Sequence, residues 1–300
     1  MPRLSIIVPH LQDDSGLEQT LVSILENRGR SLELVIVHDG SYTDPYGLNQ
    51  DEAVLVETKR GTSLTSQLNL AIASARSPYI QVLSPGAVVA EGWYDEALEI
   101  LEQGSVEVVC QPIACTDSNE IVSGLSDSSL PHRRVTGSMA EVGSPLMVGS
   151  IMRKQFLEAL GGWMERSTRE IAEVEMGLLL SALGAEIAIA ESVGIQGSRQ
   201  VVSGQESGYE IGHACGQLAC AYATIENSGV VIDSVARRLG HLASGLMSPK
   251  TVAERLGWVL GVKNRAFVET IQRRLSRAQE AIANLPSGFA MPDYSMRRAA

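Results

Sequence analysis

Short apolar runs alternate with helix-like segments through the first part of the chain. Leu4–Val8 and Leu32–Val37 are apolar runs that predict buried strands. Between them, apolar residues recur at helical spacing after Asp14 and Ser15, either of which can cap the helix: Leu17, Leu21, Ile24 and Leu25. A strand, a helix and a strand within about 35 residues are typical of a parallel βαβ unit.

The same alternation continues along the chain. Further strands are predicted at Ala53–Val56, Tyr79–Leu83, Val106–Cys110, Leu146–Ile151 and Glu186–Ala190, and further helices at about Thr65–Ala75, Gly92–Gln103, Arg153–Leu160 and Arg169–Leu183. This order predicts an α/β fold with a Rossmann-like, mostly parallel sheet flanked by helices. In such a fold the ligand site lies at the carboxyl ends of the strands.

Two segments interrupt the rhythm. Residues 112–145 are rich in Ser, Gly and Asp, which predicts a mobile surface loop or a lid over the site. Gly194–Gly208 is polar and has no periodicity, so it is read as a linker or a second flexible loop.

The last hundred residues are helical in character, with apolar periodicity in Ile211–Ala223, Val231–Leu246, Thr251–Leu260 and Ala266–Ala283. We therefore expect an α/β domain over residues 1–200 and a helical C-terminal region over residues 201–300. These helices would pack on the core or form a homo-oligomer interface. A helix lying on a membrane surface is the alternative, but the apolar faces are rich in Ala and Leu and poor in Trp and Phe.

Composition limits the function classes. The 300 residues carry a formal net charge of −11, and such a surface repels nucleic acids. The sequence shows no signal peptide and no apolar run of about 18 residues, so we expect a cytoplasmic protein. The four cysteines form two pairs with the same offset, Cys110/Cys115 and Cys215/Cys220. A four-thiolate zinc site or two disulfides would be alternatives, but zinc sites use tighter spacing, which favours buried free thiols.

Candidate binding residues follow the first two predicted strands: Pro9, His10, His38, Asp39, Gly40 and Ser41. A nucleotide base laid across strand ends needs backbone edges and one acid to accept its ring N–H, which Asp39 could supply. Gly40 permits a sharp turn and a close approach to a ligand, and Ser41 could contact ribose. The alternative is an ordinary turn that ends a strand.

Three blocks in this order, Leu4–Pro9, Leu21–Leu25 and Leu34–Asp44, resemble the family 2 glycosyltransferases of the GT-A fold. Weaker matches continue at Asn69, Ala75, Tyr79-Ile80, Trp93, Leu160–Trp163 and Glu173–Met176, so the resemblance covers about residues 4–190. It implies transfer of a sugar, with inversion, from a nucleotide-sugar donor (UDP- or GDP-linked) to a hydroxyl of a glycan or another acceptor.

The sequence departs from this family at the positions that handle charge. Members usually carry two aspartates after the fourth strand, which hold Mn²⁺ or Mg²⁺ against the diphosphate. Here Ser84, Pro85 and Gly86 stand there, His38 replaces a usual acid, and Leu68 replaces a usual Arg. Either the protein binds diphosphate at Ser84 and Gly86 without a strongly held metal, or it has lost transfer and become a binding or scaffold protein.

The resemblance also implies a general base. Ala172–Glu175 matches the family's acidic motif, which puts Glu173 in the position of the carboxylate that deprotonates the acceptor; a solvated helix residue is the alternative. A compensating cation site could use His10 and His38 with Asp13, Asp14 or Asp39, although a His at a loop edge is more often structural.

One basic group could act without a metal. Arg133 and Arg134, preceded by His132, could form a basic lid over phosphate, with an exposed loop as the plainer reading. A nucleotidyltransferase fits less well, since its phosphate loop after the first strand would be basic and Gly-rich, whereas Asp13-Asp14 is acidic.

Overall fold

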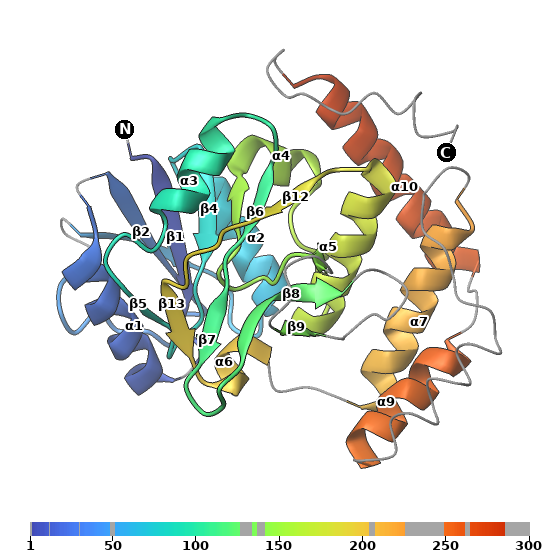
Figure 1. Ribbon diagram of the computed structural model, residues 1–300, viewed down its shortest axis with the longest axis horizontal. Coiled ribbons are helices and arrows are strands. Elements are labelled where there is room, and N and C mark those ends of the chain that lie inside the picture. Colours follow the sequence, from blue (N-terminus) through green and yellow to red (C-terminus); the bar gives the residue numbers. More distant parts are fainter. Residues whose placement is uncertain are drawn as a thin grey trace.

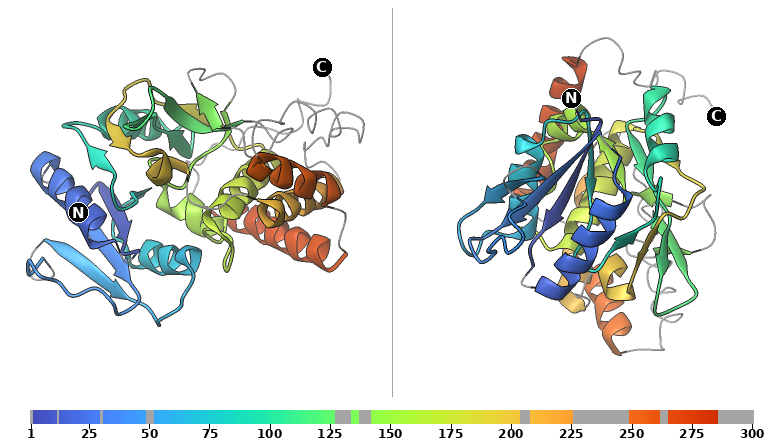
Figure 2. Two further views of the ribbon diagram at one scale, coloured as in Figure 1. Left: turned by 90° about the horizontal axis from the view of Figure 1, so that it is seen from below. Right: turned by 90° about the vertical axis from the view of Figure 1, so that its left-hand side faces the viewer.

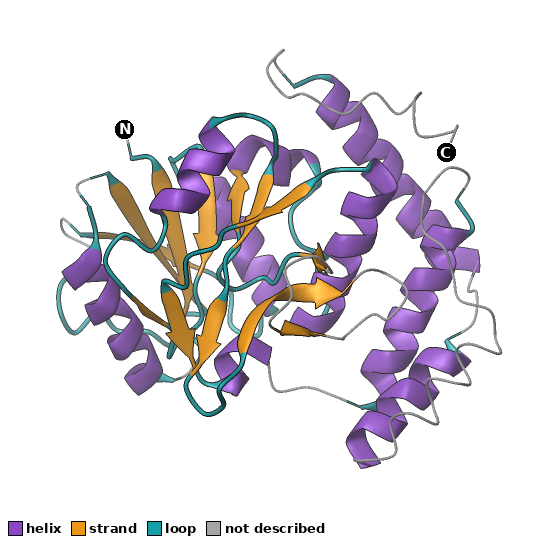
Figure 3. Cartoon of the chain, in the orientation of Figure 1, coloured by secondary structure: helices purple, strands orange, loops and turns teal. Residues whose placement is uncertain are grey.

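The main sheet holds seven strands in a computed structural model that describes residues 2–11, 13–29, 31–48, 52–126, 134–136, 142–203, 208–225, 249–261 and 265–285 (Figures 1 and 3). Its order is β12-β6-β11-β4-β1-β2-β3. The strands are β1 (Leu4–Pro9), β2 (Leu32–His38), β3 (Ala53–Glu57), β4 (Tyr79–Val82), β6 (Val108–Cys110), β11 (Ile151–Arg153) and β12 (Ile187–Ile189).

This sheet confirms the predicted mostly parallel arrangement. β1 lies in the middle, parallel to β2 and β4, and all six of its residues are buried. Strands covered on both faces are apolar throughout, and the LSIIVP sequence of β1 fits this rule apart from Ser5. Only β11 runs antiparallel to its neighbours in the main sheet, β4 and β6.

A second sheet replaces the loops that the sequence predicts. Its order is β10-β8-β7-β13-β5, with β9 paired to β8. Its strands are β5 (Val88–Val89), β7 (Ile113–Cys115), β8 (Ile121–Ser126), β9 (Arg134–Thr136), β10 (Val142–Ser144) and β13 (Ile195–Gly197). The loop prediction for 112–145 is therefore wrong for the part of that segment that the structure describes, and β13 and α6 (Arg199–Ser203) replace the linker predicted at 194–208.

Pairing between distant segments explains these errors. β13 lies between β5 and β7, with Ile195 opposite both Val89 and Ile113. Partners so far apart in sequence stabilise short, polar strands that local periodicity does not reveal. The strand predicted at Leu146–Ile151 is also misplaced: residues 146–150 form a buried turn in which Gly149 has φ +89°, and β11 follows it.

The remaining core helices lie near their predicted positions: α1 (Asp14–Asn27), α2 (Leu64–Ser74), α3 (Asp95–Glu102), α4 (Lys154–Ala159) and α5 (Arg169–Leu183). The cap of α1 is Asp13 rather than Asp14 or Ser15, because the Asp13 side chain accepts a hydrogen bond from the N–H of Gly16.

Three C-terminal helices gather beside α5, namely α7 (Tyr209–Ala223), α9 (Pro249–Leu260) and α10 (Arg265–Ala283) (Figures 1 and 2). α7 packs on α5 and α9, and α10 packs on α4, α5 and α7. Packing on the core is thus confirmed for α7 and α10, whereas α9 packs on α7 and the predicted helix Val231–Leu246 lies outside the described residues. Within the described part of the chain, no helix is both long and apolar enough to cross a bilayer.

α7 and α9 approach each other through glycines. A Cβ placed on Gly212 of α7 would lie 1.8 Å from the carbonyl oxygen of Glu254, and one on Gly257 of α9 would lie 2.0 Å from that of Tyr209. A Cβ on Gly216 or on Gly261, each four residues further along, would lie 2.4 or 2.7 Å from a carbonyl oxygen of the opposite segment. The two helices therefore pack backbone against backbone.

Candidate active site

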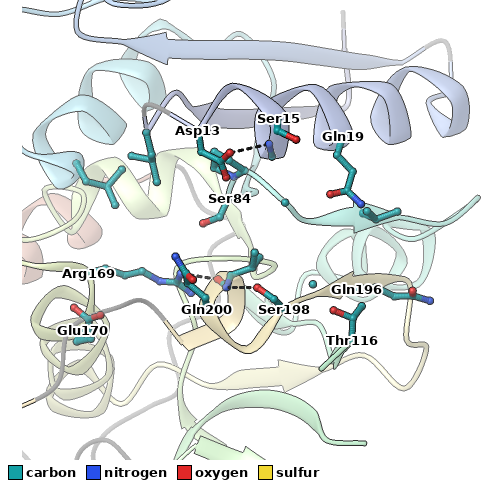
Figure 4. A pocket seen from close by; sticks show the side chains of 18 of the residues that line it. Asp13, Ser15, Gln19, Ser84, Thr116, Arg169, Glu170, Gln196, Ser198 and Gln200 are labelled. Carbon is teal, nitrogen blue, oxygen red and sulfur yellow. Dashed lines mark hydrogen bonds between the residues drawn. The ribbon is translucent and has the colours of Figure 1, made fainter. Parts of the chain in front are cut away.

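A cleft of about 1250 Å³ opens at the carboxyl ends of β1 and β4 (Figure 4). One wall comes from the residues after β1, the start of α1 and the turn after β4, and includes Asp13, Ser15, Gln19 and Ser84. The other wall comes from the start of α5, from β13, from α6 and from the residue after β7, and includes Thr116, Arg169, Glu170, Gln196, Ser198 and Gln200. The site therefore lies at the sheet edge that the parallel topology predicts.

The turn after β4 places Ser84 and Gly86 on the cleft, and its backbone is adapted to glycine. Gly86 has φ +87°, its N–H donates to the carbonyl oxygen of Gly16 at 2.8 Å, and a Cβ on it would lie 3.0 Å from Val201. An aspartate at position 86 would be strained and would meet Val201. The backbone conformation of Gly86 thus disfavours the second aspartate that family members usually carry after the fourth strand.

The residues of this turn do not provide the ligands that a divalent cation needs. Among the described residues, no three His, Cys, Asp or Glu side chains come together as a ligand set. Ser84 contributes only a hydroxyl, and the oxygen-rich shell that Mn²⁺ or Mg²⁺ needs would have to include several more protein groups.

The opposite wall is organised by Arg169. Its Nε donates to Glu173 at 2.9 Å, and its two terminal nitrogens donate to the carbonyl oxygens of Val201 and Val202 at 2.7 and 2.8 Å. The guanidinium therefore ties α5 to α6, and its charge is compensated inside the protein.

Glu173 lies behind this arginine. Its side chain is 1% exposed, and Oε1 accepts hydrogen bonds from Arg169 and from the N–H of Met147, the latter at 2.9 Å. Glu173 does not line the cleft, whereas Glu170, one turn earlier on the same helix, does. The assignment of Glu173 as general base stays a prediction, and the ion pair would have to open for the carboxylate to reach an acceptor.

The residues predicted to bind a nucleotide form a separate cluster beyond β1 and β2. Asp39 accepts a hydrogen bond from the Ser41 hydroxyl at 2.5 Å, and that hydroxyl lies 3.2 Å from Nδ1 of His10. The Ser41 contact lowers the pKa of the Asp39 carboxyl, so Asp39 is ionised and acts as an acceptor. None of these three residues lines the cleft.

The two histidines do not form a cation site. Nε2 of His10 lies 2.8 Å from Asp14, and Nδ1 of His38 accepts from the N–H of Gly40 at 3.1 Å. Both rings instead contact Tyr42, with centroid distances of 5.4 and 5.8 Å. The alternative cation site is therefore wrong, because each imidazole is turned toward a local partner and the Tyr42 ring.

Two residues that lie in the weaker family matches, Asn69 and Glu175, connect separate elements of the fold. Asn69 on α2 donates to the carbonyl oxygen of Trp163 and accepts from its N–H, both at 2.8 Å, and so joins α2 to the turn before α5. Glu175 on α5 binds the C-terminal helices through Tyr222 and Arg274.

The prediction of buried thiols is confirmed for Cys110, Cys115 and Cys215, whereas Cys220 is half-buried; none of the four forms a disulfide. Burial raises the pKa of Cys110 to about 12 and that of Cys215 well above its usual value, so neither is a thiolate at neutral pH.

Sequence reasoning missed most of the cleft. Gln19, Thr116, Gln196, Ser198 and Gln200 match no motif, and all of them except Gln19 lie in segments predicted to be loops. The basic lid at Arg133 lies outside the described residues, and so do the side chains of Arg134 and His132.

The sheet and its cleft define an α/β protein of the GT-A type. Residues 5–152 match the sequence model of glycosyl transferase family 2. This part of the chain is therefore a family 2 glycosyltransferase-like domain. No curated protein matches the chain closely enough to supply a relative.

Proposed function

We propose that the protein transfers a sugar from a UDP- or GDP-linked donor to an acceptor hydroxyl, with inversion of the anomeric carbon. The observation that carries this proposal is the cleft of about 1250 Å³ between the turn after β4 and the start of α5. The base and ribose would bind near Pro9, His10, His38, Asp39, Gly40 and Ser41. The diphosphate would lie toward Ser84 and Gly86.

In this reaction the acceptor oxygen forms a bond to the anomeric carbon while the bond from that carbon to the β-phosphate oxygen breaks. The nucleoside diphosphate leaves, and a carboxylate takes the acceptor proton. Two carboxylates of α5 compete for this role. The motif selects Glu173, whereas Glu170 is the one that lines the cleft.

No step is assigned to a metal, because Ser84-Pro85-Gly86 offers no carboxylate. The main-chain N–H groups and neutral side chains of the cleft would have to stabilise the leaving diphosphate instead. A cytoplasmic location and a homo-oligomer through the C-terminal helices stay predictions.

A binding or scaffold role is the second candidate. It is favoured by the compensated charge of Arg169, which leaves the cleft without a free cation among the described lining residues. Such a protein would bind sugars or nucleotides without turnover.

Turnover with a panel of nucleotide sugars separates the two candidates. The full chain is incubated with UDP- and GDP-linked sugars, with EDTA, Mg²⁺ or Mn²⁺, and released nucleoside diphosphate is measured. Release that persists in EDTA supports the proposed transfer. No release under any condition, together with binding of UDP or GDP by calorimetry, supports the binding role.

A further inference from the structure

We propose that His10 is an imidazolium that fastens the start of α1 to the turn after β2, and that loss of one of its two ring protons opens this clasp. The clasp consists of Asp14, His10, Ser41 and Asp39, joined in that order by three hydrogen bonds. It does not depend on sugar transfer, since it joins two backbone segments through the charge of one side chain.

The acceptor at one end of the clasp fixes where the first ring proton lies. The Asp39 carboxyl accepts from the Ser41 hydroxyl at 2.5 Å, and this contact lowers the pKa of Asp39, so the carboxylate is ionised and can only accept. The single hydroxyl proton of Ser41 is therefore used on Asp39. The Ser41 oxygen, 3.2 Å from Nδ1 of His10, is left as an acceptor, so Nδ1 must carry a proton.

The other ring nitrogen faces a second carboxylate. Nε2 of His10 lies 2.8 Å from Oδ1 of Asp14, whose side chain is 91% exposed to water, and an ionised carboxylate only accepts. Either neutral tautomer has one bare ring nitrogen, which would face the Asp14 carboxylate or the Ser41 oxygen with no proton between them. Only the doubly protonated ring donates to both partners.

Burial works against this charge. The His10 side chain is 3% exposed, and removal from water favours the neutral ring. Two carboxylates oppose that effect, Asp14 in direct contact and Asp39 beyond Ser41, and charge-assisted hydrogen bonds are stronger than neutral ones. A neutral ring would also lose one of its two contacts, which is costly in the interior. The hydrogen-bond geometry therefore favours the imidazolium.

The aromatic neighbour of His10 is compatible with a positive ring. Tyr42 packs against His10 with the ring centroids 5.4 Å apart. Burial first, and then the nearby Asp44, Tyr46 and Asp14, raise the pKa of Tyr42, which is therefore an uncharged phenol at neutral pH. The acids beside it favour a positive charge on His10.

The second histidine lies beyond Tyr42 and does not repel a charged His10. The ring centroid of His38 is 5.8 Å from that of Tyr42, and its Nδ1 accepts from the N–H of Gly40 at 3.1 Å. A ring nitrogen that accepts carries no proton, so His38 is neutral in this arrangement.

The clasp holds the connection between β1 and α1, which forms part of the cleft. Asp13, next to Asp14, lines the cleft. Its carboxylate accepts from the N–H of Gly16 at 3.0 Å, and the Gly16 carbonyl oxygen accepts from the N–H of Gly86 at 2.8 Å. As the pH rises and the ring loses a proton, the clasp opens and loosens the rim of the cleft beside the turn after β4.

The test measures the protonation of His10 in the full chain, labelled with ¹⁵N-histidine and free of nucleotide, by two-bond ¹H–¹⁵N correlation NMR. This spectrum distinguishes an imidazolium from both neutral tautomers, and His10→Gln identifies the His10 signals among those of the five histidines. A free imidazole is mostly neutral at about pH 7.5, whereas we expect His10 to be mostly doubly protonated there. One bare ring nitrogen on His10 at this pH overturns the proposal.

Asp14→Asn and Ser41→Ala each remove one partner of the ring. Each should lower the ratio of protonated to neutral His10 about fivefold at the same pH, because the ring loses a carboxylate or the hydroxyl that links it to one. Glu26→Gln is the matched control, since it makes the same change of charge at an exposed position of α1, about 18 Å further along the helix and beyond the range of screened charges. It should leave the ratio unchanged, and circular dichroism checks that all variants fold. A ratio that is unchanged in both Asp14→Asn and Ser41→Ala overturns the clasp.

Hydrogen exchange tests the link to the cleft. The protection of the Gly16 amide, corrected for the intrinsic effect of pH, should fall as the neutral form of His10 accumulates. Protection that stays constant while His10 loses its proton overturns the proposed opening. None of these readouts requires turnover of a nucleotide sugar, so failure of the proposed function is measured separately.

Discussion

Arg274 of α10 donates to both carboxylate oxygens of Glu175 on α5, at 2.8 Å from Nε and 3.2 Å from a terminal nitrogen. The same guanidinium donates to the carbonyl oxygen of Gly162, and Tyr222 of α7 donates to Glu175 at 2.7 Å. Glu175 is fully buried, so its charge depends on these partners. One carboxylate thus connects the glycosyltransferase-like core to two C-terminal helices.

Arg274→Met should destabilise the fold by about 3–5 kcal/mol, because it leaves the buried Glu175 charge uncompensated. Tyr222→Phe, which removes a single hydrogen bond, should cost about 1 kcal/mol. Urea unfolding followed by circular dichroism measures both. Arg273→Met, at an exposed position of the same helix, is the control. Equal stability of the Arg274 and Arg273 variants would show that the ion pair does not hold α10 on the core.

Gly257→Ala should destabilise the protein although alanine favours helices. In an open helix this change stabilises by about 1 kcal/mol. Here the new Cβ would lie 2.0 Å from the carbonyl oxygen of Tyr209, so α7 and α9 must separate. A lower melting temperature confirms the close packing, and a higher one contradicts it.

Restoring a family acid at position 86 should not restore a metal site. Gly86→Asp and Gly86→Ala should both lower stability by about 1–2 kcal/mol, since both force a side chain into a left-handed backbone conformation. Titration with Mn²⁺, followed by electron paramagnetic resonance, should give the same weak binding for both variants. Tight Mn²⁺ binding by the aspartate variant alone would show that the turn adapts to a metal.

Glutamine variants of Glu170 and Glu173 should distinguish a carboxylate that takes part in catalysis from one that stabilises the fold. If Glu170 takes the proton, Glu170→Gln should lower kcat about 10²–10⁴-fold. Glu173→Gln should lower the melting temperature, because Arg169 loses its buried counterion. A Glu173 variant that is fully stable yet inactive, beside an active Glu170 variant, would favour the motif-based assignment.

The Asp39 carboxyl should titrate below its ordinary pKa of 3.8, mainly because the Ser41 hydroxyl donates to it. A lowered pKa in the folded state contributes stability that is fully present above this ordinary value and is lost as the pH falls through the folded pKa. Ser41→Ala should raise the Asp39 pKa toward 3.8, as carbon-detected NMR titration would show. An unchanged pKa would mean that Ser41 does not donate to Asp39 in solution.

The sequence predicted the main sheet well because its signal is local. β1, β2 and β4 are short apolar runs, and the helices between them show apolar faces of the right period. β13 could not be predicted in this way, since its pairing with β5 joins residues about 106 positions apart, as Ile195 and Val89 are. Local periodicity carries no information about such partners.

The candidate site was likewise predictable only where the sequence carries a local signal. Ser84 and Gly86 were found because a family motif marks the end of β4, and they do line the cleft. Gln196 and Gln200 carry no motif, and their role depends on where β13 and α6 return to the cleft. Glu173 was chosen by its position in a motif, and only the structure reveals the arginine and the Met147 N–H that surround its carboxylate.

The position of β13 and α6 affects how the ligand preference of this protein can evolve. The wall facing the turn after β4 comes mainly from residues after 152, with Thr116 as an exception, so the segment that matches the family encloses only part of the cleft. Substitutions in the other side can alter ligand choice while the family signature stays intact. A fragment cut at residue 152 would keep the signature and lose half of the binding surface, so ligand preference in related chains must be compared over the longer segment.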